Sequence, residues 1–223
     1  MIETSCPKRV LALVPLALLS ATARAGDWMP FQSTSVTQSY VLEDLLAQGP
    51  TPQGGGVIVT EFMKDPAAVA DTRGEWIELY NTLPWRVNIE GWSVADDSGA
   101  QFVIQNGGQG VRLAPGQYYV LGNSTDPLLN GGVTVQFGYS GFTLGNGADQ
   151  IVLLKPNGVI VDRVAYDDGV AWPDLAGRSI SLTRSLRDAL SNDDGAHWCP
   201  STTLWNAGSA DTGTPGADND LCP

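Results

Sequence analysis

The sequence predicts an all-β protein, a sandwich or a barrel, whose strands begin at Val57. Short runs rich in β-branched and aromatic residues follow one another at close spacing, among them VIVTEFM, GEWIELYN, GQYYVLG, QIVLLK, VIVDRVAYD and RSISLTR. The segments between them, such as DTRG, LAPG, LNGG and KPNG, have the composition of turns. This region shows no helical periodicity over several turns. Many short strands without helices predict two packed β-layers or a closed barrel around one core.

The first 25 residues predict a signal peptide. Lys8 and Arg9 precede an apolar run, VLALVPLALLS, and a small-x-small cleavage site ends at Ala25. The run is too short to span a bilayer, and no second hydrophobic stretch follows it. The first mature residue is then Gly26 rather than the cysteine of a lipoprotein. We expect a secreted or periplasmic protein with no transmembrane segment in its mature chain.

Residues 26–56 are predicted to be a lead-in to the β-region. Within them, YVLEDLLAQ (40–48) can form one or two helical turns, and GPTPQGGG then interrupts regular structure with Pro and Gly.

Two segments after Val57 predict pairs of strands joined by a turn. In LLKPNGVIV (153–161), the turn Pro156-Asn157-Gly158 predicts a hairpin. In QGVRLAPGQYYVLG, Pro115-Gly116 suits a type II turn between two strands. Further strands are expected in VNIEGWSVAD, AQFVI and VTVQFGYSGF.

The strand GEWIELYN (74–81) carries two carboxylates. Side chains alternate along a strand, so Ile77 and Leu79 point to one face and Glu78 to the other. Glu75 and Glu78 lie three residues apart and therefore face opposite sides, so they cannot converge on one substrate atom as an acid–base pair must. We expect such carboxylates to accept turn N–H groups or to meet an arginine such as Arg86 or Arg112.

The charge balance excludes polyanionic partners. The chain has 12 basic and 24 acidic side chains and a net charge of −12, and removal of the signal peptide enlarges the acidic excess. Nucleic-acid binding requires clustered Lys and Arg, so we expect no nucleic-acid partner and no attraction to an anionic membrane. Solubility outside the cell explains the acidity, and a surface for cations or basic partners is the alternative.

Two cysteines remain in the mature chain, Cys199 and Cys222. An even count in an oxidising compartment predicts a disulfide between them. Such a bridge stabilises the protein by about 3 kcal/mol and restrains a tail rich in Gly, Asn and Asp. A metal site or a nucleophilic thiol is less favoured, because the spacing is too wide for a CxxC-type pair.

Several of these segments together resemble the lamin tail domain family, in its exported bacterial form. The resemblance starts in IVTEFMKDP (58–66) and continues through GEWIELYN (74–81), IEGWSVAD (89–96) and LAPGQYYVLG (113–122). It ends in RSISLTRS (178–185), AHWCPS (196–201) and GTPGADN (213–219). The resemblance thus predicts one domain over residues 57–219 that includes the tail closed by the disulfide.

The resemblance implies an immunoglobulin-like β-sandwich without catalytic function. Such domains occur alone or attached to secreted hydrolases and nucleases, where they serve attachment or protein contact. We therefore expect a binding or attachment module, not an enzyme, with a protein or a cell-envelope component as partner. In nuclear lamins the fold also contributes to DNA binding, which the acidic excess argues against here. The sequence departs from the family's polar turn by placing Trp85 next to Arg86.

Catalytic motifs find little support. The only histidine is His197, so it is the single candidate for the base of a Ser-His-Asp triad. GYSG (138–141) is not GxSxG, because Phe142 follows it, and GGQG (107–110) lacks the spacing of a phosphate-binding loop. We assign no catalytic or cofactor-binding residue.

Calcium is the one cofactor with some support, and we assign no ligand to it. Oxygen-rich loops carry Asp96-Asp97, Asp167-Asp168 and Asn192-Asp193-Asp194. None fits the alternating calcium loop, and turn formation explains the same residues. A calcium-dependent hydrolase remains the enzyme alternative.

Four tryptophans fall in loops or in the lead-in, namely Trp28, Trp85, Trp172 and Trp205. Exposed aromatic rings stack on sugars or contact proteins, which keeps a carbohydrate-binding module as an alternative. The other explanation is that these rings seal the open ends of the sandwich.

Overall fold

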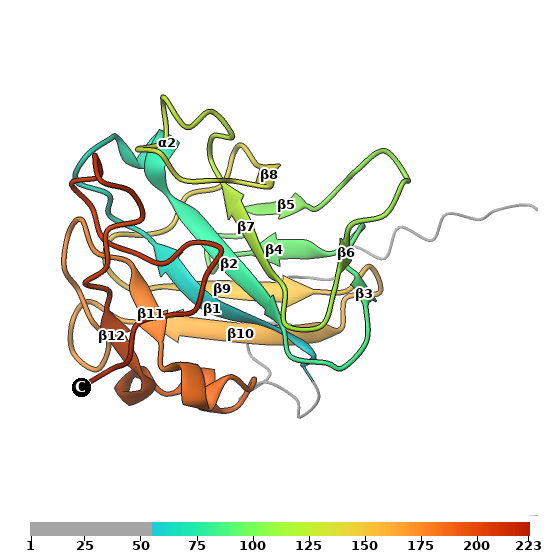
Figure 1. Cartoon of the computed structure of the whole chain (residues 1–223). Helices are drawn as coiled ribbons and strands as arrows, with labels where there is room; N and C mark the ends of the chain where they lie inside the picture. The colour runs from blue at the N-terminus through green and yellow to red at the C-terminus, as the bar shows by residue number, and fades with distance from the viewer. Residues whose placement is uncertain (1–54) are drawn as a thin grey trace, which may run out of the picture. The chain divides into compact units, whose positions relative to one another are not determined.

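The computed structural model describes residues 55–223 (Figure 1). Residues 1–54 fall outside that part, and with them the predicted signal peptide, its cleavage site after Ala25, Trp28 and all but the last two residues of the lead-in. Within residues 55–223, no helix is both long and apolar enough to cross a membrane.

The larger sheet has six strands in the order β12-β11-β1-β2-β7-β8 (Figure 1). The strand bounds are β1 Val57–Met63, β2 Trp76–Asn81, β7 Tyr118–Gly122, β8 Phe137–Gly138, β11 Ile180–Leu182 and β12 Trp198–Pro200. Neighbouring strands are antiparallel except for β7 and β8, which are parallel.

The second sheet has four antiparallel strands in the order β10-β9-β4-β5, and a short pair joins β3 to β6. Their bounds are β3 Val87–Asn88, β4 Ser93–Ala95, β5 Gln101–Val103, β6 Arg112–Leu113, β9 Asp149–Leu154 and β10 Ile160–Tyr166. Within residues 55–223, helical structure is limited to single turns, which are α2 (Asp71–Gly74) and the 3-10 turns η1 (Arg184–Leu186), η2 (Ser191–Asp193) and η3 (Gly195–His197).

One apolar core lies between the two larger sheets, so the predicted β-sandwich is confirmed. Phe62, Ile77 and Leu79 of the six-stranded sheet belong to the same buried cluster as Ile151 and Val164 of the four-stranded sheet. The alternation predicted for GEWIELYN is also confirmed, because Trp76 lies in a different cluster from Ile77 and Leu79.

Local structure follows the turn signals in part. The hairpin predicted for residues 153–161 is confirmed as β9–β10, with Gly158 at φ 79° in its turn. The predicted strand VTVQFGYSGF is wrong over most of its length, since only Phe137–Gly138 form a strand. In QGVRLAPGQYYVLG both strands exist, but β6 pairs with β3 and β7 with β2.

The outer face of β1 is covered by the C-terminal tail. All seven β1 residues are buried, including the polar Thr60 and Glu61. Asn219 donates its side-chain amide to the carbonyl oxygens of Thr60 (2.6 Å) and Leu182 (2.9 Å). The tail therefore completes the sandwich on this side.

Two polar side chains fill the part of the β1 edge that no strand pairs. Strand β11 pairs with β1 only at Glu61 and Phe62. Beyond these, the Val59 N–H donates to Asp162 Oδ2 (2.7 Å), and the Asn192 amide donates to both the Val59 carbonyl (3.2 Å) and Asp162 Oδ2 (2.8 Å). The N–H and carbonyl groups of Val59, which β11 does not pair, are thus hydrogen-bonded by side chains.

Candidate functional site

The polar residues of GEWIELYN bind three different segments of the chain. Glu75, just before β2, is buried, and its Oε2 accepts a hydrogen bond from the Leu144 N–H (3.1 Å). Burial raises the pKa of Glu75 to about 8, and the charges of Asp71 and Asp149 raise it as well. Glu75 therefore positions the segment that leads into β9.

Glu78 binds the C-terminal tail beside a second buried carboxyl group, Glu61. The two residues are cross-strand neighbours on β2 and β1. Glu78 accepts hydrogen bonds from the Thr60 hydroxyl (2.8 Å) and the Gly216 N–H (2.6 Å). Burial raises the pKa of Glu78 well above its ordinary value, and the Glu61 charge raises it further.

Glu61 accepts more hydrogen bonds than its neighbour. Its donors are the hydroxyls of Ser179, Ser181 (2.9 Å) and Thr214 (2.6 Å), together with the Thr214 N–H (2.8 Å). Burial raises the pKa of Glu61, and these hydrogen bonds oppose that rise because they favour the ionised form. The pair joins the tail to the centre of the larger sheet.

These contacts decide between the explanations offered for Glu75 and Glu78. Both accept backbone N–H groups, as expected, and they serve separate segments. The alternative of an ion pair with Arg86 or Arg112 is wrong. Within the described residues, the salt bridges are Lys64–Asp174, Arg184–Asp218 and Arg187–Asp218.

The predicted disulfide joins Cys199 on β12 to Cys222 near the chain end, with a Cα–Cα distance of 5.4 Å. It closes the tail that Glu61 and Glu78 bind. Close packing explains the glycine at position 213, because a Cβ there would lie 3.0 Å from both Ser179 Oγ and the Trp76 ring.

Three of the aspartates considered for calcium form turns. Asp96 accepts from the Ser98 hydroxyl (2.8 Å) and the Ala100 N–H (2.9 Å). Asp194 accepts from the Ala196 N–H (2.9 Å) at the start of η3. Asp167 accepts N–H groups from Val170, Ala171 and Trp172. Across residues 55–223, no group of three or more His, Cys, Asp or Glu side chains is placed to hold a metal ion.

His197 lies in a packed loop. Its Nδ1 is 2.6 Å from the Ser191 carbonyl oxygen, a backbone atom, so this contact does not activate a serine hydroxyl.

The loop tryptophans divide into buried and exposed rings. Trp172 is buried against Trp198, with ring centroids 5.3 Å apart. Trp205 packs edge-on against Trp76 and donates its indole N–H to the Gly131 carbonyl (2.9 Å). Trp85 is 60% exposed. The sealing role thus holds for Trp172 and Trp205, whereas the Trp85 ring is left exposed.

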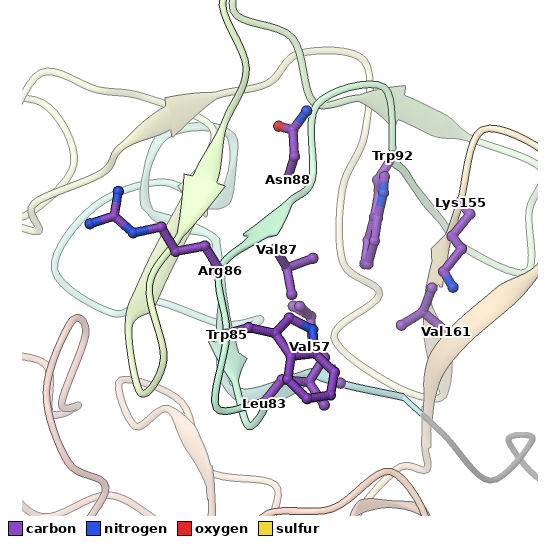
Figure 2. Close-up of a pocket in the computed structure, with 10 residues that line it drawn as sticks. Val57, Leu83, Trp85, Arg86, Val87, Asn88, Trp92, Lys155 and Val161 are labelled. Carbon is purple, nitrogen blue, oxygen red and sulfur yellow. The ribbon is translucent and has the colours of Figure 1, made fainter.

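Trp85 borders a pocket of about 330 Å³ (Figure 2). Three segments form it, namely the start of β1, residues 83–92, and the β9–β10 hairpin with Lys155 and Val161. Figure 2 shows the Trp92 ring at one side and Val161 at another, and Trp85, Val57 and Leu83, which overlap in this view, also line the pocket. A concave site with apolar walls and few polar groups is typical of a binding site.

Asn81, the last residue of β2, fixes the loop that carries Trp85. Its buried side-chain amide donates to the carbonyl oxygens of Trp85 (2.9 Å), Leu113 (3.0 Å) and Ala114 (3.1 Å). Its Oδ1 accepts from the Leu83 N–H (3.0 Å). The loop is therefore held in place although the Trp85 ring is exposed.

Gly56 closes the base of the same loop. A Cβ at this position would lie 2.1 Å from Leu83 Cδ1, so only glycine allows the observed packing. The Gly56 carbonyl also accepts from the Thr82 N–H (2.9 Å). Sequence reasoning did not identify Gly56, Asn81 or Lys155, because their place in the site depends on segments that are distant along the chain.

Comparison of the sequence with models of known protein families gives a match. A family model described as Lamin Tail Domain matches residues 50–168, a range that contains all the described residues that line the pocket. No curated protein matches the sequence.

Proposed function

The chain belongs to the lamin tail domain family, and we propose that it is a non-catalytic binding or attachment module that contacts a partner through the Trp85 pocket. We further propose that it acts in the cell envelope or outside the cell, to which the predicted signal peptide would direct it. The partner class that fits this role is a protein or another envelope component, and the acidic excess disfavours nucleic acid.

The observation that carries the proposal is an exposed indole on an anchored loop. Exposed aromatic rings are frequent energetic centres of interfaces, and rigid presentation lowers the entropy lost on binding. Trp85 is 60% exposed while the backbone of its loop is bonded by Asn81. This combination supports recognition rather than core packing at Trp85.

The use of the polar side chains supports a role without catalysis. Glu61, Glu75 and Glu78 are occupied by donors from the fold itself. Within the described residues, three aspartates considered for a calcium-dependent hydrolase, Asp96, Asp167 and Asp194, are likewise occupied in turns. A reactive site instead needs groups that converge on one substrate atom.

Parallel capture with two proteins tests the proposal. The mature chain and its Trp85→Ala variant are immobilised and exposed to an extract of the cells that produce the protein. We expect a component that is enriched on the wild-type resin and severalfold weaker on the variant. Equal retention on both resins would count against the pocket as contact site. Turnover of nuclease, phosphatase or glycosidase substrates by the purified chain would overturn the non-catalytic role.

A carbohydrate-binding module is the second candidate, favoured by the same exposed ring, because indole faces stack on sugars. Titration of soluble glycans against tryptophan fluorescence tests it, with Trp85→Ala as control. A saturable change that the variant loses would support this candidate, and no change across a broad panel would remove it.

A further inference from the structure

The charges around the pocket are opposite in sign to those of the whole chain. The chain carries 24 acidic and 12 basic side chains. Among residues 55–223, those that line the pocket include two cations, Arg86 and Lys155, and no carboxylate. The local field therefore favours an anionic group on whatever binds here.

The two cations are available to a ligand. Salt bridges within the described residues involve other basic side chains, namely Lys64, Arg184 and Arg187. Figure 2 shows Lys155 extending toward Val161 at the side of the pocket, whereas the Arg86 guanidinium is directed away from the other labelled side chains. Lys155 is thus the cation placed closest to a bound group.

The apolar part of the pocket lining is formed by Val57, Leu83, Val87, Trp92 and Val161. Asn88 is the one uncharged polar side chain in the lining, and its Oδ1 already accepts from the Val111 N–H (2.8 Å). An apolar group with one charged neighbour matches the valines and Trp92 of this lining together with Lys155.

The size of the pocket points to an amino-acid side chain. A volume of about 330 Å³ lies at the lower end of small-molecule sites. A bulky side chain occupies such a space, while the exposed Trp85 ring offers contact area to the backbone that carries it.

We propose that the pocket binds a segment of a partner protein in which a large apolar side chain is followed by Asp or Glu. The apolar side chain enters between Trp92, Val57 and Val161, and the carboxylate lies at Lys155. This assignment rests on the proposed binding function and names the chemistry of its partner.

Methyl NMR with short peptides tests the assignment, because the pocket presents valine and leucine methyl groups. The mature chain with ¹³C-labelled Val and Leu methyls is titrated with acetyl-Phe-Glu-amide. Acetyl-Phe-Gln-amide and acetyl-Ser-Glu-amide are the matched controls. We expect saturable shifts at the pocket methyls, with a dissociation constant of about 1–10 mM for so small a probe. The reference methyl, Val133, lies in the separate cluster beside Trp76 and is expected not to move.

The expected loss of affinity for each substitution follows from the contact that the substitution removes. One partly exposed ion pair contributes about 0.2–1 kcal/mol, so the Gln peptide should bind about one and a half- to fivefold more weakly than the Glu peptide. Lys155→Gln should abolish this difference, whereas Arg73→Gln, an equal charge change at exposed α2, should preserve it. Trp85→Ala should weaken the Phe-Glu peptide by about tenfold.

Several results would overturn the assignment. One is the absence of shifts at the pocket methyls at about 20 mM peptide. Others are equal binding of the Glu and Gln peptides, or equal binding of the Ser and Phe peptides. The last is a preference for the Glu peptide that persists in Lys155→Gln. If the peptides do not bind but capture still depends on Trp85, only the proposed ligand chemistry is refuted. Loss of Trp85-dependent capture refutes the proposed function itself.

Discussion

Asp162 offers a quantitative test of how the sandwich is held together, through the pH dependence of stability. Its carboxyl group is fully buried and accepts from the Val59 N–H and the Asn192 amide. Burial raises the pKa of Asp162 from 3.8 to about 7, although these hydrogen bonds partly oppose the rise. Asp193 adds a like charge that also raises this pKa.

The sign of the effect follows from proton binding. Between pH 4 and pH 7 the native state keeps the Asp162 proton, while the unfolded chain loses it. The native state therefore binds more protons, and the free energy of unfolding falls as pH rises through this range. At about 1.4 kcal/mol per pH unit, the loss amounts to about 4 kcal/mol. Above pH 7 no further loss from this group is expected.

Asp162→Asn removes the titration and keeps an oxygen that can accept both hydrogen bonds. Any packing change shifts the variant's stability by an offset that does not depend on pH. Urea unfolding of both proteins, followed by tryptophan fluorescence from pH 4 to pH 8, gives the difference in unfolding free energy. Other buried carboxyls, such as Glu75 and Glu78, titrate in both proteins and largely cancel in that difference.

The variant should gain about 4 kcal/mol relative to wild type between pH 4 and pH 7. Parallel stability curves for the two proteins would refute the reasoning, because Asp162 would then have the same proton affinity folded and unfolded. A difference that grows in the opposite direction would mean that the native state favours the ionised form.

Three further predictions concern the tail and the pocket. Cys222→Ser should lower the free energy of unfolding by about 3 kcal/mol, and thiol counting on the denatured, unreduced mature wild-type protein should find none. Glu78→Gln should be tolerated at pH 7, whereas Glu78→Ala leaves the Gly216 N–H unpaired and should cost about 2 kcal/mol in urea unfolding. Asn81→Ala removes the amide donors to the Trp85 loop; hydrogen exchange should accelerate there, and unchanged protection would contradict the anchoring role.

The strands and the orientation of their side chains were predictable from the sequence because they depend on local periodicity. The alternation in GEWIELYN placed Ile77 and Leu79 in the core before any partner strand was known. The disulfide was predictable from a count, since the two cysteines that follow the predicted signal peptide permit one pairing. The two-residue β8 marks the limit, because propensity predicted a strand where the chain pairs only briefly.

Tertiary structure alone decided what the polar residues of that strand do. Glu75 and Glu78 bind N–H groups 69 and 138 positions away, and Asn81 reaches a carbonyl 32 positions away. Local patterns fix which face a side chain occupies, whereas a hydrogen-bond partner is fixed by which distant segment packs there. The pocket beside Trp85 has the same origin, because three separate segments meet to form it.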